Sequence, residues 1–325
     1  MVIIFMIRRL MLLALLATGL SMLFTKLWIA FSRRESIGQP IREEGNKAHY
    51  KKQGTPTMGG VAFIAVFLLL YLLFGQKDRA MVLILLSTVG FGAIGFVDDY
   101  AKIRKKESEG LTPRQKLILQ VGLAALLVIL FFFFHPDAGI QRIPLVNWML
   151  NLSVFWAPIL VFILVGTVNA VNLTDGLDGL CAGVSLPVFL ALFVETKIFY
   201  RDFLSAGTAA WIFLFVLLGY LVFNAYPASV MMGDTGSMAI GGAICAIFLS
   251  QNISLYLVIF GGVYMMETLS VIIQVTYFKH TGGKRIFLMS PIHHHFELKG
   301  YPESKITASF CILSTILCLV GLLFL

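Results

Sequence analysis

Charged residues are scarce in this sequence: Asp, Glu, Lys and Arg make up 13% of its 325 residues. Apolar residues make up 58%, and the mean hydropathy is +0.88. Soluble domains carry about 25% charged residues. A long polar region is also missing, because the longest hydrophilic stretch, residues 32–58, is only long enough for a loop. These shortages exclude a soluble globular protein and predict one integral membrane domain over residues 1–325.

Cysteine is also rare, with four residues in the chain. All four lie in or beside apolar runs, without the spacing of a metal site: Cys181, Cys245, Cys311 and Cys318. Cysteines in such positions behave as small buried apolar residues. We therefore assign them no disulfide and no chemistry.

Long apolar runs are what the sequence has in abundance. A hydrocarbon core of roughly 30 Å needs about 20 helical residues, and ten runs approach that length. They cover residues 5–31, 59–74, 81–98, 115–134, 152–171, 180–195, 206–223, 236–250, 254–278 and 304–325. Because the runs are continuous rather than alternating, and because a helix satisfies its own backbone in lipid, we predict an all-α protein with about ten transmembrane helices.

The basic residues predict the orientation of these spans. Seventeen of the 25 Lys and Arg residues fall in the odd-numbered loops between spans. Cytoplasmic loops are enriched in Lys and Arg. We therefore expect the odd-numbered loops in the cytoplasm and, because the number of spans is even, both termini outside.

Five polar motifs are expected to meet at this cytoplasmic face. They are KKQGTPTMGG (51–60), VDDYAK (97–102), NLTDGLDGL (172–180), FNAYPASVMMGDTGS (223–237) and SPIHHHFELKG (290–300). We expect Asp98 and Asp99 to begin the second cytoplasmic loop and the later motifs to form the third, fourth and fifth loops. Topology alone then brings together residues more than two hundred positions apart.

The aspartates in these motifs predict a cation site. Asp175 and Asp178 are three residues apart, and Asp234 stands between Gly233 and Gly236, with no basic neighbour in either motif. Carboxylate oxygens without local counterions suit Mg²⁺, which completes its coordination with water and substrate phosphate. Two alternatives are solvated acids at a helix end and helix capping, with Asn172 or Asp175 opening the sixth span.

Three consecutive histidines, at positions 293–295, leave several interpretations open. They could be a solvated loop cluster, recognise phosphate or transfer protons. Neighbouring histidines do not face one point on regular structure, so a zinc site is disfavoured. Lys52, Lys102 and Arg285 are expected at the same face, which favours an anionic substrate.

Two classes of function fit these residues. One is a Mg²⁺-dependent membrane enzyme that acts on phosphates, and the other is an ion-coupled transporter. Transporters place ionisable groups near the middle of the membrane, whereas these acids lie at one rim. Glu267, inside the ninth span, favours the transporter, although it could also form the floor of a cleft.

The five motifs, in the same order and over nearly the whole chain, resemble those of the phospho-N-acetylmuramoyl-pentapeptide-transferase family. This family belongs to the polyprenyl-phosphate N-acetylhexosamine-1-phosphate transferases. The resemblance implies ten helices, periplasmic termini, a bacterial inner-membrane location and an active site on the cytoplasmic face. It also implies Mg²⁺ as cofactor.

The resemblance implies that UDP-N-acetylmuramoyl-pentapeptide donates its phospho-sugar to undecaprenyl phosphate. The products would be lipid I and UMP, in the first membrane step of peptidoglycan synthesis. Membrane lipid is an implied partner and nucleic acid is not. A homodimer, the third residue of the accepted peptide, and a one-step or two-step reaction all stay open.

The family motifs also imply a set of site residues. The implied catalytic residues are Asp98, Asp99, Asp234, His293 and His294, with Asp234 as the metal ligand. The implied substrate-binding residues are Lys52, Thr57, Lys102, Asn172, Asp175, Asp178, Asn224, Met231 and Gln274. Met231 is a departure, because the family commonly has Phe there. Whether Met231 replaces the aromatic contact with uracil stays open, because a thioether can also cover a ring face.

Overall fold

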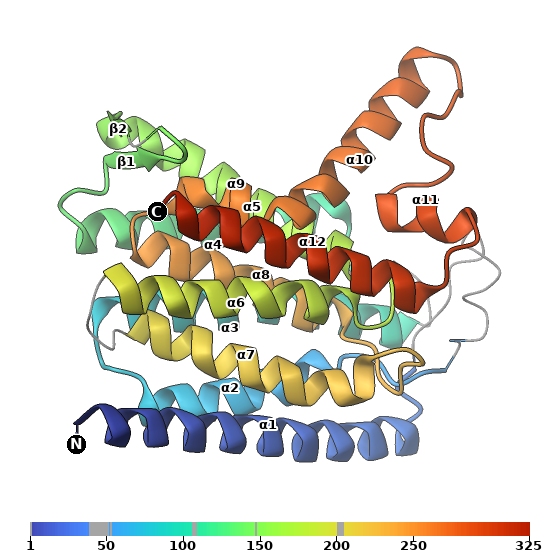
Figure 1. The fold of residues 1–325 in the computed structure, drawn as a ribbon. Helices are drawn as coiled ribbons and strands as arrows, with labels where there is room; N and C mark the ends of the chain where they lie inside the picture. The colour runs from blue at the N-terminus through green and yellow to red at the C-terminus, as the bar shows by residue number, and fades with distance from the viewer. Residues whose placement is uncertain (1, 39–51, 53, 106–108, 147, 200–204) are drawn as a thin grey trace.

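The computed structural model describes residues 2–38, 52, 54–105, 109–146, 148–199 and 205–325, and most of the predicted first cytoplasmic loop lies outside these ranges. Its helices run side by side as a bundle (Figure 1). The α-helices are α1 (Val2–Arg34), α2 (Gly60–Phe74), α3 (Arg79–Lys105), α4 (Pro113–Phe134), α5 (Trp156–Thr174), α6 (Leu180–Phe199), α7 (Ser205–Asn224), α8 (Gly233–Ser250), α9 (Leu257–Phe260), α10 (Gly262–His280), α11 (Ile292–Leu298) and α12 (Glu303–Leu323). The strands are β1 (Ile140–Ile143) and β2 (Trp148–Asn151), and the short 3₁₀ turns are η2 (Ser153–Phe155) and η3 (Ser254–Tyr256).

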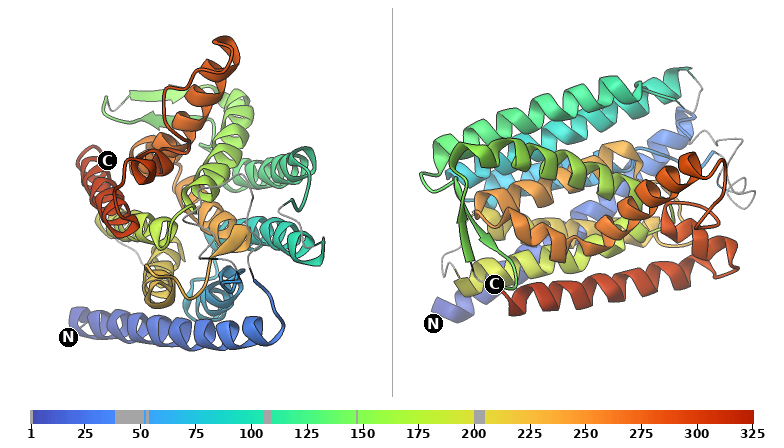
Figure 2. Two further views of the ribbon diagram at one scale, coloured as in Figure 1. Left: turned by 90° about the vertical axis from the view of Figure 1, so that its right-hand side faces the viewer. Right: turned by 90° about the horizontal axis from the view of Figure 1, so that it is seen from above.

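The predicted all-α membrane fold is confirmed. Helix occupies all ten predicted ranges, and eight helices in the described part of the chain are long and apolar enough to cross a membrane. The start of α1 and the end of α12 lie at the same end of the bundle (Figures 1 and 2), as an even number of crossings requires. We call the opposite end the site end, because it carries the residues described below.

α8 forms the centre of the bundle. Almost all of its side chains are buried, and most of them are small, in the sequence GDTGSMAIGGAICAIFLS. Small side chains let helices approach closely within a membrane. α3 and α5 pack along α8, so the ends of these three helices meet at the site end.

The ninth predicted span differs from the expectation of one straight helix. η3 and α9 together form a short first part, α10 forms the second, and the two parts meet at 81° around Gly261. α10 therefore projects away from the bundle (Figure 1). α2, with 15 residues, is shorter than a full crossing.

A small hairpin, absent from the sequence prediction, connects α4 to α5 at the end opposite the site. β1 and β2 pair antiparallel, with Ile140 opposite Asn151 and Ile143 opposite Trp148. The strands run crosswise to the helices (Figure 2). Four-residue strands are too short for the periodicity that identifies a strand in a sequence.

Several predicted loops are partly helical. Asp98 and Asp99 lie inside α3, Asn172 belongs to the last turn of α5, and Asn224 is the last residue of α7. The prediction that these residues belong to loops is wrong. A helix can continue beyond its apolar run when its polar residues find partners, and the next section describes those partners.

Candidate active site

Three aspartates from distant parts of the chain meet at the site end. Asp98 and Asp99 come from the second half of α3, and Asp234 comes from the first turn of α8. One carboxylate oxygen from each lies within 4.8 Å of the others. Asp98 and Asp99 are almost fully buried. Buried charge is costly unless it is paired, so this cluster must be compensated by its surroundings.

Glycines allow α3 and the start of α8 to come this close. A Cβ on Gly95 would lie 2.2 Å from the backbone oxygen of Asp234, so only glycine fits between the two helices. Gly233 has a φ of +74°, a conformation that favours glycine. A Cβ there would lie 2.6 Å from Asp99 Oδ2.

Asp99 caps α8 from the neighbouring helix. Its Oδ2 accepts hydrogen bonds from the Thr235 backbone N–H at 2.9 Å and the Thr235 hydroxyl at 2.7 Å, and its Oδ1 accepts one from the Asp234 N–H at 3.2 Å. The first N–H groups of a helix have no partner within the helix. Asp99 supplies that partner, and it thereby fixes the position of Asp234.

Two lysines neutralise the other two aspartates. Lys102 Nζ lies 2.6 Å from Asp98 Oδ2 and 2.9 Å from Asp234 Oδ2. Lys116 Nζ, from the first turns of α4, lies 2.7 Å from Asp234 Oδ2. The expectation that Asp234 has no counterion is therefore wrong. Lys102 is four residues after Asp98, a spacing that brings side chains together on a helix.

The end of α5 completes the surroundings of Asp234. Asn172 Nδ2 donates to Asp234 Oδ1 at 2.8 Å and to Ser237 Oγ at 2.9 Å. Capping of the sixth span by Asn172 or Asp175, an alternative raised from the sequence, does not occur, because α6 begins at Leu180. Asn172 instead orients the predicted metal ligand.

The oxygen donors of this cluster fit a divalent cation. The ammonium groups of Lys102 and Lys116 contact Asp98 Oδ2 and Asp234 Oδ2. Positive charge is therefore already bound at the point where the three carboxylates converge. Lysine side chains are flexible and can move aside for a metal ion. Asp99 is engaged by the backbone of α8, and Asp234, in the first turn of α8, is the residue that would hold Mg²⁺.

A second charged group lies beside the cluster. Lys52 Nζ is 2.7 Å from Asp178 Oδ1 and 2.8 Å from Glu303 Oε2. Burial by itself lowers the pKa of the Lys52 ammonium, but hydrogen bonds and charge from the two carboxylates outweigh burial and raise this pKa above its ordinary value. Lys52 is therefore a permanent cation in a largely enclosed position.

Asp175 differs from Asp178 although both come from the same motif. Asp175 ends α5, and burial together with the negative charges of Asp234, Asp99 and Asp178 raises its pKa to about 8. Asp178 is held by Lys52 and by the backbone N–H of Ala228, at 2.9 Å. Asp175 and Asp178 thus lie in different surroundings and do not share one common ligand.

The implied substrate-binding residues near Thr57 lie at a compact junction of backbone hydrogen bonds. The Met231 N–H donates to Pro56 O at 2.7 Å, and the Gly59 N–H donates to Met231 O at 2.9 Å. Thr57 O accepts a hydrogen bond from Trp28 Nε1 at 2.9 Å, and Asn224 Nδ2 donates to Val230 O at 3.0 Å. These contacts bring the first and fourth motifs together, directly before α8, the helix that carries Asp234.

The histidine motif is a short helix rather than a loop. His293 on α11 is fully buried, its Nδ1 lies 3.1 Å from Glu267 Oε2, and a Cβ on Gly176 would lie 2.1 Å from its Nε2. His294 Nδ1 lies 3.0 Å from Glu297 Oε2. His293 thus links the fifth motif to Glu267 of α10 and to Gly176 of the third motif.

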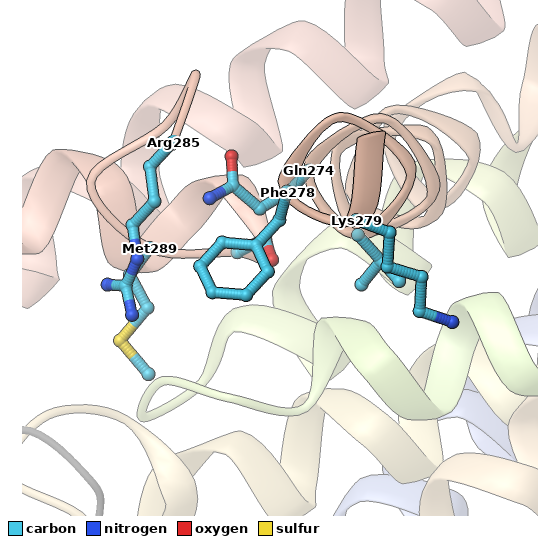
Figure 3. A pocket seen from close by; sticks show the side chains of 7 residues that line it. Gln274, Phe278, Lys279, Arg285 and Met289 are labelled. Carbon is cyan, nitrogen blue, oxygen red and sulfur yellow. The ribbon is translucent and has the colours of Figure 1, made fainter. Parts of the chain in front are cut away.

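Gln274 lies in a separate pocket of about 310 Å³ between α10 and the chain that leads to α11. Its Oε1 accepts hydrogen bonds from the backbone N–H groups of Ile286 and Phe287. Figure 3 shows the Phe278 ring between α10 and the chain that carries Arg285 and Met289. This pocket combines an apolar lining with basic side chains.

Sequence reasoning missed Lys116, Thr235, Ser237 and Glu303. A signal existed for Lys116, because Thr112 and Gln115 form a capping box that begins α4 and places Lys116 in its first turns. For Glu303, the contact with Lys52 joins residues 251 positions apart, and the sequence alone gave no reason to pair them.

These observations define a class of protein: a membrane helix bundle with a site of acidic and basic residues at one end. Comparison with known proteins supports this class. The sequence model of glycosyl transferase family 4 matches residues 80–252, more than half of the chain. This range contains all three clustered aspartates. The chain is a multi-pass membrane protein of glycosyl transferase family 4.

More specific matches identify the branch. Signature 1 of the phospho-N-acetylmuramoyl-pentapeptide-transferases matches residues 52–64. Relatives with this name come from Staphylococcus carnosus (44% identical, covering 95% of this chain and 97% of the relative), Caldanaerobacter subterraneus (42%, 96% and 97%) and Bacillus licheniformis (43%, 93% and 94%). The chain belongs to the phospho-N-acetylmuramoyl-pentapeptide-transferase family, which confirms the resemblance found in its motifs.

Proposed function

We propose that this protein transfers phospho-N-acetylmuramoyl-pentapeptide from UDP-N-acetylmuramoyl-pentapeptide to undecaprenyl phosphate, giving lipid I and UMP. The observation that carries the proposal is the convergence of Asp98, Asp99 and Asp234 within 4.8 Å, with Lys102 and Lys116 in contact. A diphosphate donor and a phosphate acceptor bring several negative charges together. Cations arranged at one point stabilise these negative charges.

The residues of the cluster divide the work. Asp234 would hold Mg²⁺, which when bound neutralises charge on the diphosphate. Lys102 and Lys116 bind the phosphate oxygens in the same region. Asp98 is our choice for the base that deprotonates the acceptor phosphate, whose oxygen then attacks the sugar-linked phosphorus in a single displacement and releases UMP.

The donor and acceptor reach the cluster from different sides. Lys52, Asp178 and the junction at Thr57 and Met231 form the side that we assign to the uridine nucleotide. The polyprenyl chain needs an apolar route from the membrane. The bend at Gly261 swings α10 out of the bundle, and the pocket lined by Phe278 and Met289 lies along it.

The site end is proposed to face the cytoplasm of a bacterium, across its inner membrane. The support is the excess of Lys and Arg in the odd-numbered loops. Cysteine introduced in place of Lys105, at the site end, should be shielded from an impermeant thiol reagent in intact cells. Cysteine in place of exposed Trp148, in the hairpin, should be labelled, and the reverse pattern would contradict the proposed orientation.

The decisive assay uses purified protein with both substrates. UMP release should require Mg²⁺, stop with chelator, and fall at least about 10²-fold in Asp234→Asn, because the variant loses the main metal ligand. A transporter would bind its substrate without forming UMP. Full turnover in metal-free buffer would exclude the proposed mechanism.

A second assay distinguishes one chemical step from two. In a two-step route an aspartate first forms a covalent phospho-sugar enzyme, and UMP leaves before the lipid binds. Donor labelled in the sugar is therefore mixed with enzyme in the absence of lipid. The single displacement predicts no stoichiometric UMP burst, and label retained on the protein would refute it.

A further inference from the structure

The first turn of α12 holds the loop that carries Asp178 from both sides. Glu303 Oε2 accepts a hydrogen bond from the Asp178 backbone N–H at 3.3 Å, and Thr307 Oγ1 donates to the Asp178 backbone oxygen at 3.2 Å. Glu303 and Thr307 are four residues apart and therefore lie on one face of the helix. Neither residue belongs to the five motifs that define the proposed site.

Glu303 also contacts Lys52 directly. The same Oε2 atom lies 2.8 Å from Lys52 Nζ, while Asp178 Oδ1 approaches that ammonium at 2.7 Å. The side chains of Lys52, Asp178 and Glu303 are 17%, 3% and 12% exposed, so the three charges are enclosed together. Two carboxylates fix the direction of the ammonium more strictly than one, because charge-assisted hydrogen bonds are short and strong.

Other residues of α12 also attach this helix to the bundle. Ile306 and Phe310 are buried, and Ser314 Oγ donates to Val184 O of α6 at 2.9 Å. These contacts lie along the length of the helix, whereas Glu303 lies at its end. A polar residue placed beyond the packed part of a helix, and aimed at a buried cation, indicates a role at that cation.

We infer that Glu303 is a positioning residue that aims the Lys52 ammonium and the Asp178 loop at the uridine nucleotide of the donor. This inference rests on the proposed function, because it takes the Lys52 side of the site as the nucleotide side. Glu303 touches Lys52 and Asp178 and not the reacting phosphates. It therefore sets donor affinity and leaves acceptor binding unchanged.

The first test separates the two substrates. Glu303→Gln keeps the shape of the side chain and removes its charge. We expect the KM for the UDP-sugar donor to rise about tenfold, because a neutral amide oxygen holds the Lys52 ammonium less strongly than a carboxylate does. The KM for polyprenyl phosphate should stay within twofold. Thr315→Val is a matched control, because the Thr315 hydroxyl is exposed on the same helix and bonds only within its own turn, to Cys311 O.

The second test asks whether Glu303 acts through Lys52. Affinity for UMP is measured directly for wild type, Glu303→Gln, Lys52→Met and the double variant. If the two residues act as a unit, Glu303→Gln should weaken binding about tenfold in wild type and have little further effect in Lys52→Met, because contacting residues are not additive. Fully additive effects would overturn the inference.

The outcomes distinguish this inference from the proposed function. If wild type binds no UMP, the assignment of the nucleotide side is wrong. If wild type binds UMP and Glu303→Gln binds it equally well, the role of Glu303 is wrong. If Glu303→Gln does not fold, Glu303→Asp is tested in its place. This variant keeps the charge but shortens the side chain by one methylene, so we expect a smaller rise in the KM for the donor. An unchanged KM for the donor would overturn the inference.

Discussion

The two ends of the bundle are held together in different ways. At the site end, ion pairs join Asp98 and Asp234 to Lys102 and Lys116. At the hairpin end, the contacts are neutral hydrogen bonds: Asn252 Nδ2 donates to Asp137 O and Ile140 O, and the Tyr256 hydroxyl donates to Phe324 O.

The difference shows what each end is built to do. Buried ion pairs are weak contributors to stability because of the cost of removing charges from water. Neutral hydrogen bonds to backbone oxygen contribute about 1 kcal/mol each without that cost. The ion pairs among Asp98, Asp234, Lys102 and Lys116 contribute little to stability, so removing one of these charges should affect mainly the reaction rate, whereas changes at the hairpin end should affect stability alone.

Asp98→Asn should give the largest effect. Loss of the proposed base should lower kcat by about 10² to 10⁴-fold, measured as UMP release with both substrates saturating. Activity should recover partly at high pH, where the acceptor phosphate is already a dianion. Wild-type turnover at neutral pH would instead make Asp98 a solely structural member of the ion-pair cluster.

Lys116→Met tests a residue that only the structure places in the site. Lys116 contacts Asp234 at 2.7 Å, and removal of one preorganised cation should lower kcat by about 10²-fold. Lys105→Met is the matched control, because Lys105 lies at the same end but is exposed and contacts Gly110 O. Equal activities of the two variants would remove Lys116 from the mechanism.

Asp99→Asn should lower stability more than Asp98→Asn does. The amide cannot accept all the hydrogen bonds that Asp99 takes from Asp234 and Thr235, so we expect a loss of about 1 to 3 kcal/mol. A fall in the melting temperature of the detergent-solubilised protein would show it. The loss of kcat should be smaller than in Asp98→Asn, and a larger loss would mean that Asp99 takes part in the chemistry directly.

Asn252→Ala is the corresponding change at the hairpin end. Two hydrogen bonds to backbone oxygen are lost, and alanine is strained at the φ of +58°, so the melting temperature should fall, with a cost of about 1 to 2 kcal/mol. Asn252→Gly relieves the strain and isolates the hydrogen bonds. Both variants should keep wild-type kcat, and a reduced kcat would contradict the separation of the two ends.

Asp175 should give the smallest effect, on the pH dependence of stability. Its pKa of about 8 in the folded protein exceeds the ordinary value near 4, so the folded state retains a proton that the unfolded state releases. Stability should therefore fall as the pH rises from about 4 to about 8. Melting temperatures in chelator at pH 5 and pH 8 should differ less for Asp175→Asn than for wild type, and equal differences would contradict the raised pKa.

The sequence alone determined the class of fold and the meeting of the motifs. Continuous apolar runs in lipid must be helices, because only helices satisfy their backbone internally at this length. An even number of such helices places alternate loops on one face, which brought Asp98, Asn172, Asp234 and His293 to the same end before any packing was known.

Only the tertiary structure decided which of these residues have which partners. Asp98 and Asp99 are identical in type and adjacent, yet one faces Lys102 and the other caps α8. The sharp bend at Gly261 and the contact of Glu303 with Lys52 are likewise set by packing between helices. The physical reason is range: hydropathy is summed along the chain, whereas hydrogen bonds and ion pairs require atoms within about 3 to 4 Å in space, wherever they lie in the sequence.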